Sequence, residues 1–463
     1  MNEYTVSIKR RRALLFAALL FLVAIGWTMR HVQSTIATIH GEGARFGIIF
    51  TVAFILLVLQ LTLAYLDTPR TVTRKQAKEL AHHWVAVNVP VYHEDPKALA
   101  AGLDSILDQK RPVQFVHVVV NGNDDTDYEI VKDYFLLKAE RVGVMAEWSV
   151  ISRKGKRQAQ GETVRKIRHL AQELAIHRHI IKVMTVDSDG ILDPHAVDEL
   201  MKPFADKKVY SVAGIVIAVN NRVNPLARFT DLLYVTAQLV DRSSQSVLNS
   251  VMVNSGVIAM YRFEVLNNCL DAYLNETFFG RAVEFSDDSR LTLEALQYGK
   301  TVQQTSAVAF TLMPENLSHH LRQYTRWMRG SFIRSWWRFK YLPMNKPVYW
   351  LHFLRWTLVL LGTFVFADIF AVEPALTHAL SPWLLVITIL IGYLQSLRYL
   401  IYQRSDESGW SRALTYSMSP LASLWSYFVL RGVRWYAIAT CLKTGWGTRK
   451  EVEVALNREL VAS

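Results

Sequence analysis

The sequence holds only two cysteines among its 463 residues, Cys269 and Cys441. So few cysteines exclude a disulfide scaffold and a cysteine-rich zinc or iron–sulfur site. The sequence also lacks a GxxxxGK(S/T) phosphate loop, a GxGxxG dinucleotide fingerprint and a GxSxG nucleophile turn. P-loop ATPases, Rossmann-type dehydrogenases and serine hydrolases depend on those motifs, so the sequence does not support any of these classes.

Apolar sequence and positive charge are what the chain has in excess. Hydrophobic residues make up 51% of it, the mean hydropathy is +0.13 and the formal net charge is +12. A disordered chain would be far less apolar. A helix needs about 20 apolar residues to cross a hydrocarbon layer about 30 Å thick. The candidate membrane spans are residues 13–29, 46–65, 348–371, 374–397 and 413–430.

The first apolar run has an alternative interpretation as a cleaved signal peptide, because Lys9, Arg10, Arg11 and Arg12 precede it. No small-x-small cleavage site follows, and a second apolar run comes soon after, which favours a retained anchor. The same basic residues predict a cytoplasmic N-terminus and a membrane hairpin that returns residues 66–346 to the cytoplasm.

The topology of residues 413–442 stays open between a hairpin that re-enters the membrane and a segment that lies in the interface. The basic residues cluster beside the apolar runs. We therefore expect membrane lipids as their partner and no nucleic acid.

The middle of the chain alternates predicted strands with predicted helices. Strands are expected at 84–90, 116–120, 180–186 and 209–219, and helices at 96–109 and 161–174. This alternation predicts an α/β domain with a mostly parallel sheet, whose ligands bind at the carboxyl ends of the strands. A polar turn follows each of the first three strands, so we expect these turns to converge.

Two acidic motifs could carry chemistry. Asp187 and Asp189 follow a strand, and two carboxylates at this spacing can reach one hard divalent cation that bridges a diphosphate. The alternative is a solvated surface turn. Asp287 and Asp288 precede a helical run, where one could act as a general base or simply cap the helix.

Two basic motifs also have alternative readings. Arg326 and Trp327 could bind phosphate oxygens and a sugar face, or belong to an amphipathic interfacial helix rich in arginine and tryptophan. Lys156 and Arg157 follow Gly155 and could face a polyphosphate, or continue a solvated basic run.

The order of the motifs resembles that of processive family 2 glycosyltransferases, the group that holds cellulose, chitin and hyaluronan synthases. In chain order they are Val89-Pro-Val-Tyr92-His-Glu94, Asn121-Gly122, Gly155-Lys156-Arg157, Asp187-Ser-Asp189, Ser255-Gly256-Val-Ile-Ala-Met-Tyr261-Arg262, Asp287-Asp288 and Gln323-Tyr-Thr-Arg326-Trp327. The ending Trp446-Gly-Thr-Arg449-Lys450, after Met418-Ser-Pro420, is similar to the C-terminus of class I hyaluronan synthases of bacteria and viruses.

The resemblance implies an integral protein of the plasma membrane, with a GT-A-type (Rossmann-like) α/β glycosyltransferase domain inserted between transmembrane helices. The expected parts are a tail and hairpin (1–66), a cytoplasmic catalytic domain (67–315), interfacial helices (316–346), C-terminal membrane or interfacial helices (347–442) and a cytoplasmic tail (443–463). A monomer is compatible with this family.

The resemblance also implies a donor site for UDP-GlcNAc and UDP-GlcA, with Mg²⁺ or Mn²⁺ as cofactor. Tyr92, Glu94 and Asn121 would hold the uridine. Asp187 and Asp189 would hold the metal and the diphosphate. The remaining donor contacts would come from Lys156, from Gln323 and Arg326 at the diphosphate, and from Arg449, which approaches with Trp446 from the C-terminal side.

On the acceptor side, the resemblance implies that Ser255, Gly256 and Trp327 border the nascent polysaccharide. Asp288, paired with Asp287, would be the general base of an inverting transfer.

The chain departs from the usual pattern at several positions. Asn121 replaces an aspartate, Val257 replaces a proline, and serines flank Asp287 and Asp288. The sugar choice therefore stays open between hyaluronan, a chitin-like poly-GlcNAc and another glucuronate-containing capsule polysaccharide. A membrane transporter or an inactive scaffold is the alternative from a different class.

Overall fold

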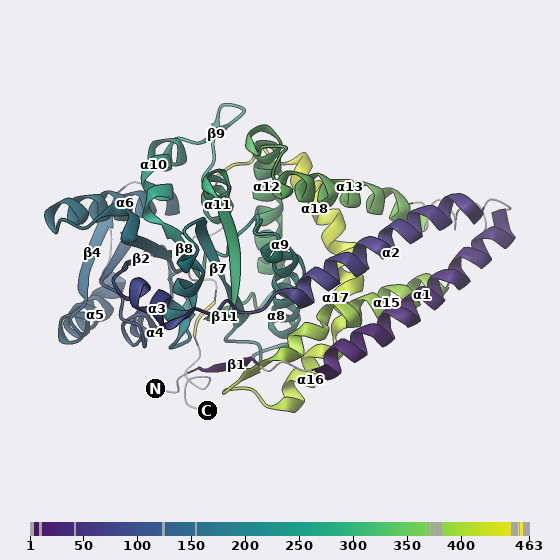
Figure 1. The fold of residues 1–463 in the computed structure, drawn as a ribbon, viewed down its shortest axis with the longest axis horizontal. Coiled ribbons are helices and arrows are strands. Elements are labelled where there is room, and N and C mark those ends of the chain that lie inside the picture. The colour runs from purple at the N-terminus through teal and green to yellow at the C-terminus, as the bar shows by residue number, and fades with distance from the viewer. Residues whose placement is uncertain are drawn as a thin grey trace.

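The computed structural model describes residues 4–8, 12–40, 43–122, 126–152, 155–367, 370–371, 375, 382–445, 452 and 454–456. A mixed sheet with helices on both faces forms one part, and a group of long helices extends from it (Figure 1). Its first helices are α1 (Arg12–His40) and α2 (Gly43–Leu66). They follow β1 (Val6–Ile8), which pairs antiparallel with β12 (Tyr402–Arg404), so the N-terminal segment lies against a segment far along the chain.

The central sheet has eight strands in the order β4-β3-β2-β5-β8-β7-β11-β6. Neighbouring strands are parallel except around β8 and β6, which run antiparallel to their neighbours. The strands are β2 (Trp84–Val91), β3 (Phe115–Asn121), β4 (Met145–Ile151), β5 (Ile181–Thr185), β6 (Ile191–Leu192), β7 (Val209–Ala218), β8 (Ala259–Arg262) and β11 (Lys300–Thr311).

Helices cover both faces of this sheet because alternate strand residues are apolar on each side. Val85 and Val87 of β2 pack toward one face and Trp84 and Ala86 toward the other. The helices of the first face are α4 (Pro96–Leu107), α5 (Glu129–Arg141) and α7 (Ala196–Met201), and those of the second are α6 (Lys156–Glu173), α10 (Phe263–Leu274) and α11 (Asp287–Tyr298). The predicted α/β domain with a mostly parallel sheet is confirmed.

The other helices lie beside the sheet or beside the pair formed by α1 and α2 (Figure 1). They are α3 (Arg74–Ala81), α8 (Pro225–Ala237), η4 (Gln238–Arg242), α9 (Ser243–Val247), α12 (Leu317–Tyr341), α13 (Pro347–Ala367), α15 (Pro382–Ser396), η6 (Leu397–Ile401), α16 (Gly409–Ser417), α17 (Ser419–Trp425), η7 (Ser426–Leu430) and α18 (Arg431–Ala439). The predicted run at 413–430 is not one helix, because α16 ends at Ser417 and α17 starts a new helix with Pro420 in its first turn.

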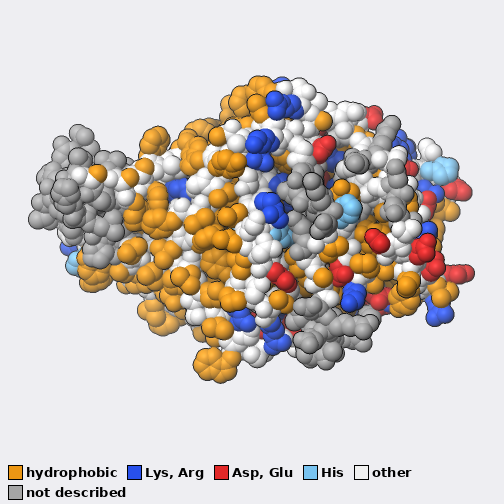
Figure 2. Space-filling view, turned by 180° about the vertical axis from the view of Figure 1, so that it is seen from behind, with side chains coloured by type: hydrophobic (Ala, Val, Ile, Leu, Met, Phe, Trp, Pro, Cys, Tyr) orange, Lys and Arg blue, Asp and Glu red, His pale blue; other side chains and the backbone are white. Residues whose placement is uncertain are grey.

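Hydrophobic side chains gather over the helical end of the molecule, whereas charged ones gather over the sheet (Figure 2). Within the described residues, one helical segment, Arg12–His31, is long and apolar enough to cross a membrane, with a hydropathy of 2.0. Thr51–Leu66 and Leu385–Ile401 are shorter apolar helices. A multi-span topology thus stays a prediction, and part of the expected span at 374–397 lies outside the described residues.

Candidate active site

The first group of candidate residues lies where β2, β3 and β5 end. Glu94 is buried, and its Oε2 accepts a hydrogen bond of 2.7 Å from Ser188 Oγ, which joins the loop after β2 to the loop after β5. Tyr92 follows β2 and Asn121 ends β3, and these strands are neighbours in the sheet. Asn121 is buried, and within the described part of the chain its Oδ1 has no hydrogen-bond partner. The predicted convergence of these loops is therefore confirmed.

Asp187 and Asp189 occupy the turn after β5. The Oδ2 atom of Asp189 accepts hydrogen bonds from Thr311 Oγ1 at 2.6 Å and from the backbone N–H of Leu312 at 3.2 Å. Asp187 Oδ1 lies 2.5 Å from Lys156 Nζ. Desolvation raises the pKa of Asp187 and Lys156 opposes this, while the charges of Asp189 and Asp287 raise it further.

Lys156 connects the two acidic motifs. It is the first residue of α6, after Gly155 in a left-handed conformation with φ of +120° that favours glycine. Its Nζ also lies 3.2 Å from Asp287 Oδ2. Desolvation disfavours the ammonium charge, but Asp187 and Asp287 outweigh it and raise the pKa of Lys156. The alternative of a solvated basic run is thus wrong for Lys156. Helix α6 begins at Lys156, earlier than the predicted start at residue 161.

Asp287 and Asp288 form the first turn of α11. Asp287 is buried and also accepts a hydrogen bond from Gln160 Nε2 at 3.2 Å. Desolvation and then the charge of Asp287 raise the pKa of Asp288 to about 7, whereas Lys156 lowers the pKa of Asp287 against the effect of burial. Two adjacent carboxyls with pKa values pushed apart are typical of an acid–base site.

The predicted acceptor residues lie next to the carboxylate of Asp187. A Cβ atom on Gly256 would lie 3.3 Å from Asp187 Oδ2, so the glycine permits this close approach. Ser255 Oγ lies 3.3 Å from the hydroxyl of Tyr234, whose ring stacks on Trp327 with centroids 5.5 Å apart. Trp327 is 36% exposed, which leaves an aromatic surface available beside the carboxylates.

Gln323 and Arg326 lie on helix α12, which also carries Trp327. A Cβ atom on Gly330 would lie 2.6 Å from Ser286 Oγ, so α12 contacts the residue that directly precedes Asp287. Gln323 Oε1 is buried and has no hydrogen-bond partner from any described residue. An unpaired buried acceptor costs free energy unless a ligand or water satisfies it.

Arg157 contacts the segment that directly precedes Asp287. Its Nη1 lies 2.7 Å from Glu276 Oε2, and its Nη2 donates to the carbonyl of Phe285 at 2.8 Å. Arg334 of α12 also pairs with Glu276, with Nη2 at 3.1 Å from Oε2. This buried cluster ties α6 and α12 to the loop before α11, so it fixes the position of Asp287.

Tyr234, Thr311 and Gln160 were not predicted from the sequence, although all three contact predicted site residues. Each comes from an element distant in sequence from its partner. Thr311 alone carried a usable signal, because it is a polar residue at the carboxyl end of a strand. Trp446 and Arg449 lie outside the described residues, and their roles stay predictions.

The donor atoms fit a hard divalent cation. Asp187 lies within electrostatic range of Asp189, Asp287 and Asp288, and Lys156 supplies the ammonium group that pairs with Asp187 and Asp287. Oxygen ligands of this kind suit Mg²⁺ or Mn²⁺. Over the described ranges, no ready group of three or more His, Cys, Asp or Glu ligands exists. An ion here would therefore complete its coordination with substrate oxygens or water.

Comparison with known proteins agrees with this chemistry. A family profile described as "Glycosyltransferase like family 2" matches residues 82–330. The chain is 30% identical over 417 residues to hyaluronan synthase of Streptococcus pyogenes serotype M1, covering 88% of this chain and 92% of that protein. It is 29% identical over 382 residues to an N-acetylglucosaminyltransferase of Rhizobium sp. (strain N33), covering 79% and 78%.

Among solved structures, a mannosyltransferase from Pyrobaculum calidifontis in complex with GDP-Man and Mn²⁺ matches with a TM-score of 0.46 and 15% identity, covering 85% of this chain and 98% of that one. The family profile covers more than half of the chain and the hyaluronan synthase match extends over most of it. The protein is therefore a glycosyltransferase with a GT-A-like domain, and it belongs to glycosyltransferase family 2 as a relative of the hyaluronan synthases.

Proposed function

We propose that the protein is a membrane-embedded, processive, inverting glycosyltransferase that polymerises UDP-GlcNAc and UDP-GlcA into hyaluronan and exports the product. The similarity to hyaluronan synthase over 88% of the chain supports this proposal. The observation that carries it is Asp288, whose pKa is raised to about 7 next to Asp187, Asp287 and the Tyr234 hydroxyl. A carboxyl in this state can accept a hydroxyl proton at neutral pH.

The donor nucleotide would bind at the ends of β2 and β3. Asn121 Oδ1 has no partner among the residues that the structure describes, so it can accept the N–H of a uracil ring. Glu94, held by Ser188, and Tyr92 would complete the uridine site. The amide of Asn121 keeps the acceptor that an aspartate would supply but carries no charge.

The diphosphate would lie over Asp187 and Asp189. A Mg²⁺ or Mn²⁺ ion held by these carboxylates would neutralise negative charge on the diphosphate as it leaves. Lys156, Gln323 and Arg326 would contact the phosphates, and Arg449 would approach from the C-terminal segment. An arginine supplies several N–H donors at once, which suits phosphate oxygens.

The transfer itself would be one displacement. Ser255, Gly256 and Trp327 would hold the acceptor sugar, with the Trp327 ring against its face. Asp288 would take the proton of the acceptor hydroxyl as that oxygen attacks the anomeric carbon. Asp287, ionised and held by Lys156 and Gln160, would keep the pKa of Asp288 high. An α-linked donor then gives a β-linked product without a covalent enzyme intermediate.

The membrane part of the proposal rests on the apolar sequence. Residues 1–66 and 347–442 would carry the transmembrane and interfacial helices of a multi-pass protein of the plasma membrane, with residues 67–315 and 443–463 in the cytoplasm. Helix α12, within residues 316–346, would lie in the interface. A monomer would suffice, since the described residues bring both acidic motifs together within one chain.

Poly-GlcNAc is the second candidate product, favoured by the similarity to the N-acetylglucosaminyltransferase of Rhizobium. The test supplies each radiolabelled UDP-sugar alone and in pairs to the purified protein. Polymer that requires both UDP-GlcNAc and UDP-GlcA, and that a hyaluronan-specific lyase digests, supports hyaluronan. Polymer from UDP-GlcNAc alone supports the second candidate, and no transfer from any UDP-sugar contradicts both and supports a transporter or an inactive scaffold.

A further inference from the structure

A short hairpin projects from the α/β domain beside helix α12 (Figure 1). Its strands are β9 (Thr277–Phe278) and β10 (Arg281–Ala282), which pair antiparallel, so Phe279 and Gly280 form a two-residue turn. Both turn residues have positive φ angles, +46° for Phe279 and +75° for Gly280. Turns of this kind usually contain Asn-Gly, Asp-Gly or Gly-Gly, because bulky residues rarely adopt positive φ. The backbone of Phe279 is therefore strained.

The two adjacent phenylalanines of the hairpin point in different directions. Phe278 is 1% exposed and meets the ring of Trp337 edge to face, with centroids 6.2 Å apart. Phe279 is 71% exposed and contacts the ring of Trp336, with centroids 6.0 Å apart. Phe278 thus attaches the hairpin to α12, whereas most of the Phe279 ring remains available. A strained backbone that displays an apolar ring points to a partner for that ring.

The base of the hairpin is fixed, so the tip keeps its place. The backbone N–H of Val283 donates to the carbonyl of Glu276 at 3.0 Å, which joins the two ends of the hairpin. The carboxylate of Glu276 pairs with Arg334 of α12, whose Nη2 lies 3.1 Å from Oε2. Together with the contact of Phe278, this ion pair presents Phe279 at a defined position beside α12.

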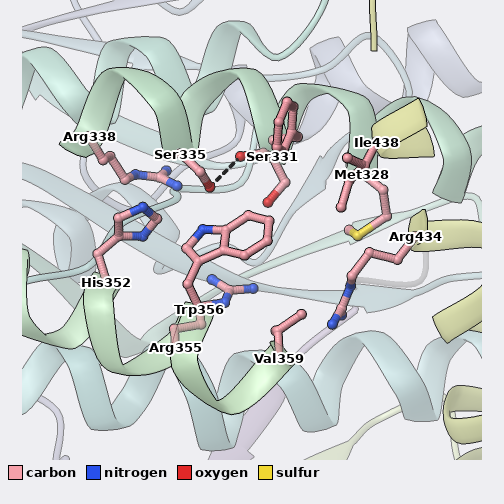
Figure 3. A pocket seen from close by; sticks show the side chains of 11 residues that line it. Met328, Ser331, Ser335, Arg338, His352, Arg355, Trp356, Val359, Arg434 and Ile438 are labelled. Atoms are coloured by element: carbon pink, nitrogen blue, oxygen red, sulfur yellow. Dashed lines mark hydrogen bonds between the residues drawn. The ribbon is translucent and has the colours of Figure 1, made fainter. Parts of the chain in front are cut away.

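Helix α12 has three faces, and the hairpin tip lies on the outer one. Figure 3 shows Ser331 and Ser335 pointing toward the cavity between α12, α13 and α18. A second face, which includes the buried Ile333, packs against the hairpin and the segment before α11. Trp336 is 52% exposed, and Lys340, one turn further along, is exposed as well. These two residues mark the outer face.

The turn and the outer face together combine exposed rings with basic groups. We name Phe279, Arg281, Trp336 and Lys340 the finger surface. Arg281 directly follows the turn and is exposed, and Lys340 Nζ lies 5.3 Å from the centroid of the Tyr341 ring. Aromatic rings favour the boundary between lipid tails and headgroups, where lysine and arginine reach the phosphates while their stems stay on apolar surface. This composition matches the interface of a bilayer.

We propose that the turn is a lipid-contacting finger of the α/β domain. The ring of Phe279 enters the bilayer interface next to Trp336, and Arg281 and Lys340 bind lipid phosphates. This inference rests on the membrane part of the proposed function. A second copy of the chain is the other candidate occupant of the surface. Its continuity with α12, which is expected in the interface, and its two basic groups beside the rings favour lipid.

The test places the photoreactive analogue p-benzoylphenylalanine at position 279 of the full-length protein, in nanodiscs of equal parts phosphatidylcholine and phosphatidylglycerol. Illumination should attach lipid to the chain, which mass spectrometry detects as the added mass of one phospholipid. Ile130 is the matched control position, because it is 87% exposed on α5, at the end of the α/β domain away from α1 and α2 (Figure 1). The same analogue at position 130 should give no lipid adduct.

The basic groups are tested in the same nanodiscs. Phosphatidylglycerol should dominate the adducts at position 279. Arg281→Gln and Lys340→Gln should each lower its share relative to phosphatidylcholine about fivefold, which corresponds to about 1 kcal/mol for one basic side chain near an anionic surface. Arg165→Gln is the control, since it removes the same charge from an exposed position on α6 and should leave the share unchanged. All three side chains are exposed or partly exposed, so the variants should fold.

The inference is wrong if position 279 gives no more lipid adduct than position 130. It is also wrong if position 279 attaches to a second chain in place of lipid, seen as a band at twice the mass of the protein. An unchanged phosphatidylglycerol share in both Arg281→Gln and Lys340→Gln would overturn the phosphate contacts. Failure of the membrane part of the proposed function gives a different result, because alkaline carbonate would then release the wild-type protein from vesicles.

Discussion

Two buried charge clusters flank the start of α11, and they are balanced in opposite ways. In the first, which we name the Glu276 cluster, Arg157 and Arg334 both pair with Glu276. In the second, the carboxylate cluster, Asp187, Asp287 and Asp288 share the single charge of Lys156. The two clusters are linked through neighbouring residues, since Arg157 follows Lys156 in the sequence.

The difference in balance explains opposite effects on two carboxyl groups. Burial opposes ionisation of both. At Glu276, Arg334 and Arg157 outweigh burial and lower the pKa to about 2. At Asp288, the charge of Asp287 adds to desolvation and raises the pKa to about 7. A carboxylate outnumbered by arginines stays ionised and holds the fold, whereas carboxylates that outnumber their one cation are available for a metal ion and a proton.

The largest expected effect is on activity, from Asp288→Asn. The amide has nearly the same shape but cannot accept the hydroxyl proton, so sugar transfer should fall about 10²- to 10⁴-fold. The thermal midpoint should stay the same or rise, because the substitution removes a like-charge contact with Asp287. Incorporation of labelled sugar measures the transfer rate, and a thermal unfolding scan of the same sample measures the thermal midpoint. Transfer at the wild-type rate would remove Asp288 from the mechanism.

The second-largest expected effect is a loss of stability in the Glu276→Gln variant. The substitution leaves Arg157 and Arg334 buried with no carboxylate, which typically costs about 3–5 kcal/mol. Thermal inactivation in detergent should shift to clearly lower temperature. The control is Asp206→Asn, which breaks the exposed pair with Lys300 and should cost about 1 kcal/mol or less. Equal shifts for the two variants would show that the Glu276 cluster does not hold the fold.

The carboxylate cluster also predicts a pH dependence. Asp288 works as a base only when ionised, and its pKa is raised to about 7. The value of kcat/KM, which reports the free enzyme, should therefore fall about tenfold per pH unit below about 7 and level off above it. If the pH profile is flat from about 5.5 to 8, Asp288 is not the group that limits transfer. A thermal scan over the same range separates this effect from unfolding.

The sequence predicted the parts of this site that follow strand ends, and it missed the parts made by contacts across the chain. The runs at 84–90 and 180–186 correspond to β2 and β5, so the turn with Asp187 was located from local pattern alone. No local pattern pairs Glu276 with Arg334, because the contact depends on how α12 crosses the loop before α11.

The basic run after Gly155 shows the same limit. Its composition suited a solvated segment as well as a phosphate site, and only the packed structure shows Lys156 between two carboxylates and Arg157 buried against Glu276. The antiparallel strand β8 was missed for a related reason, since a short apolar run carries no signal of its direction in a sheet.

The smallest expected effect extends the comparison to neutral groups. Asn121 Oδ1 is buried and finds no partner in the described ranges, whereas Asn220, also buried, has its amide fully bonded to Met313 and Glu315. Asn121→Ala should raise KM for the UDP-sugars about fivefold, the effect of one hydrogen bond of about 1 kcal/mol, with little loss of stability. Asn220→Ala should lower the thermal midpoint and leave KM unchanged, because a buried group with all its bonds made contributes to folding. If Asn121→Ala lowered stability without changing KM, the unpaired Oδ1 atom of Asn121 would be no guide to a ligand.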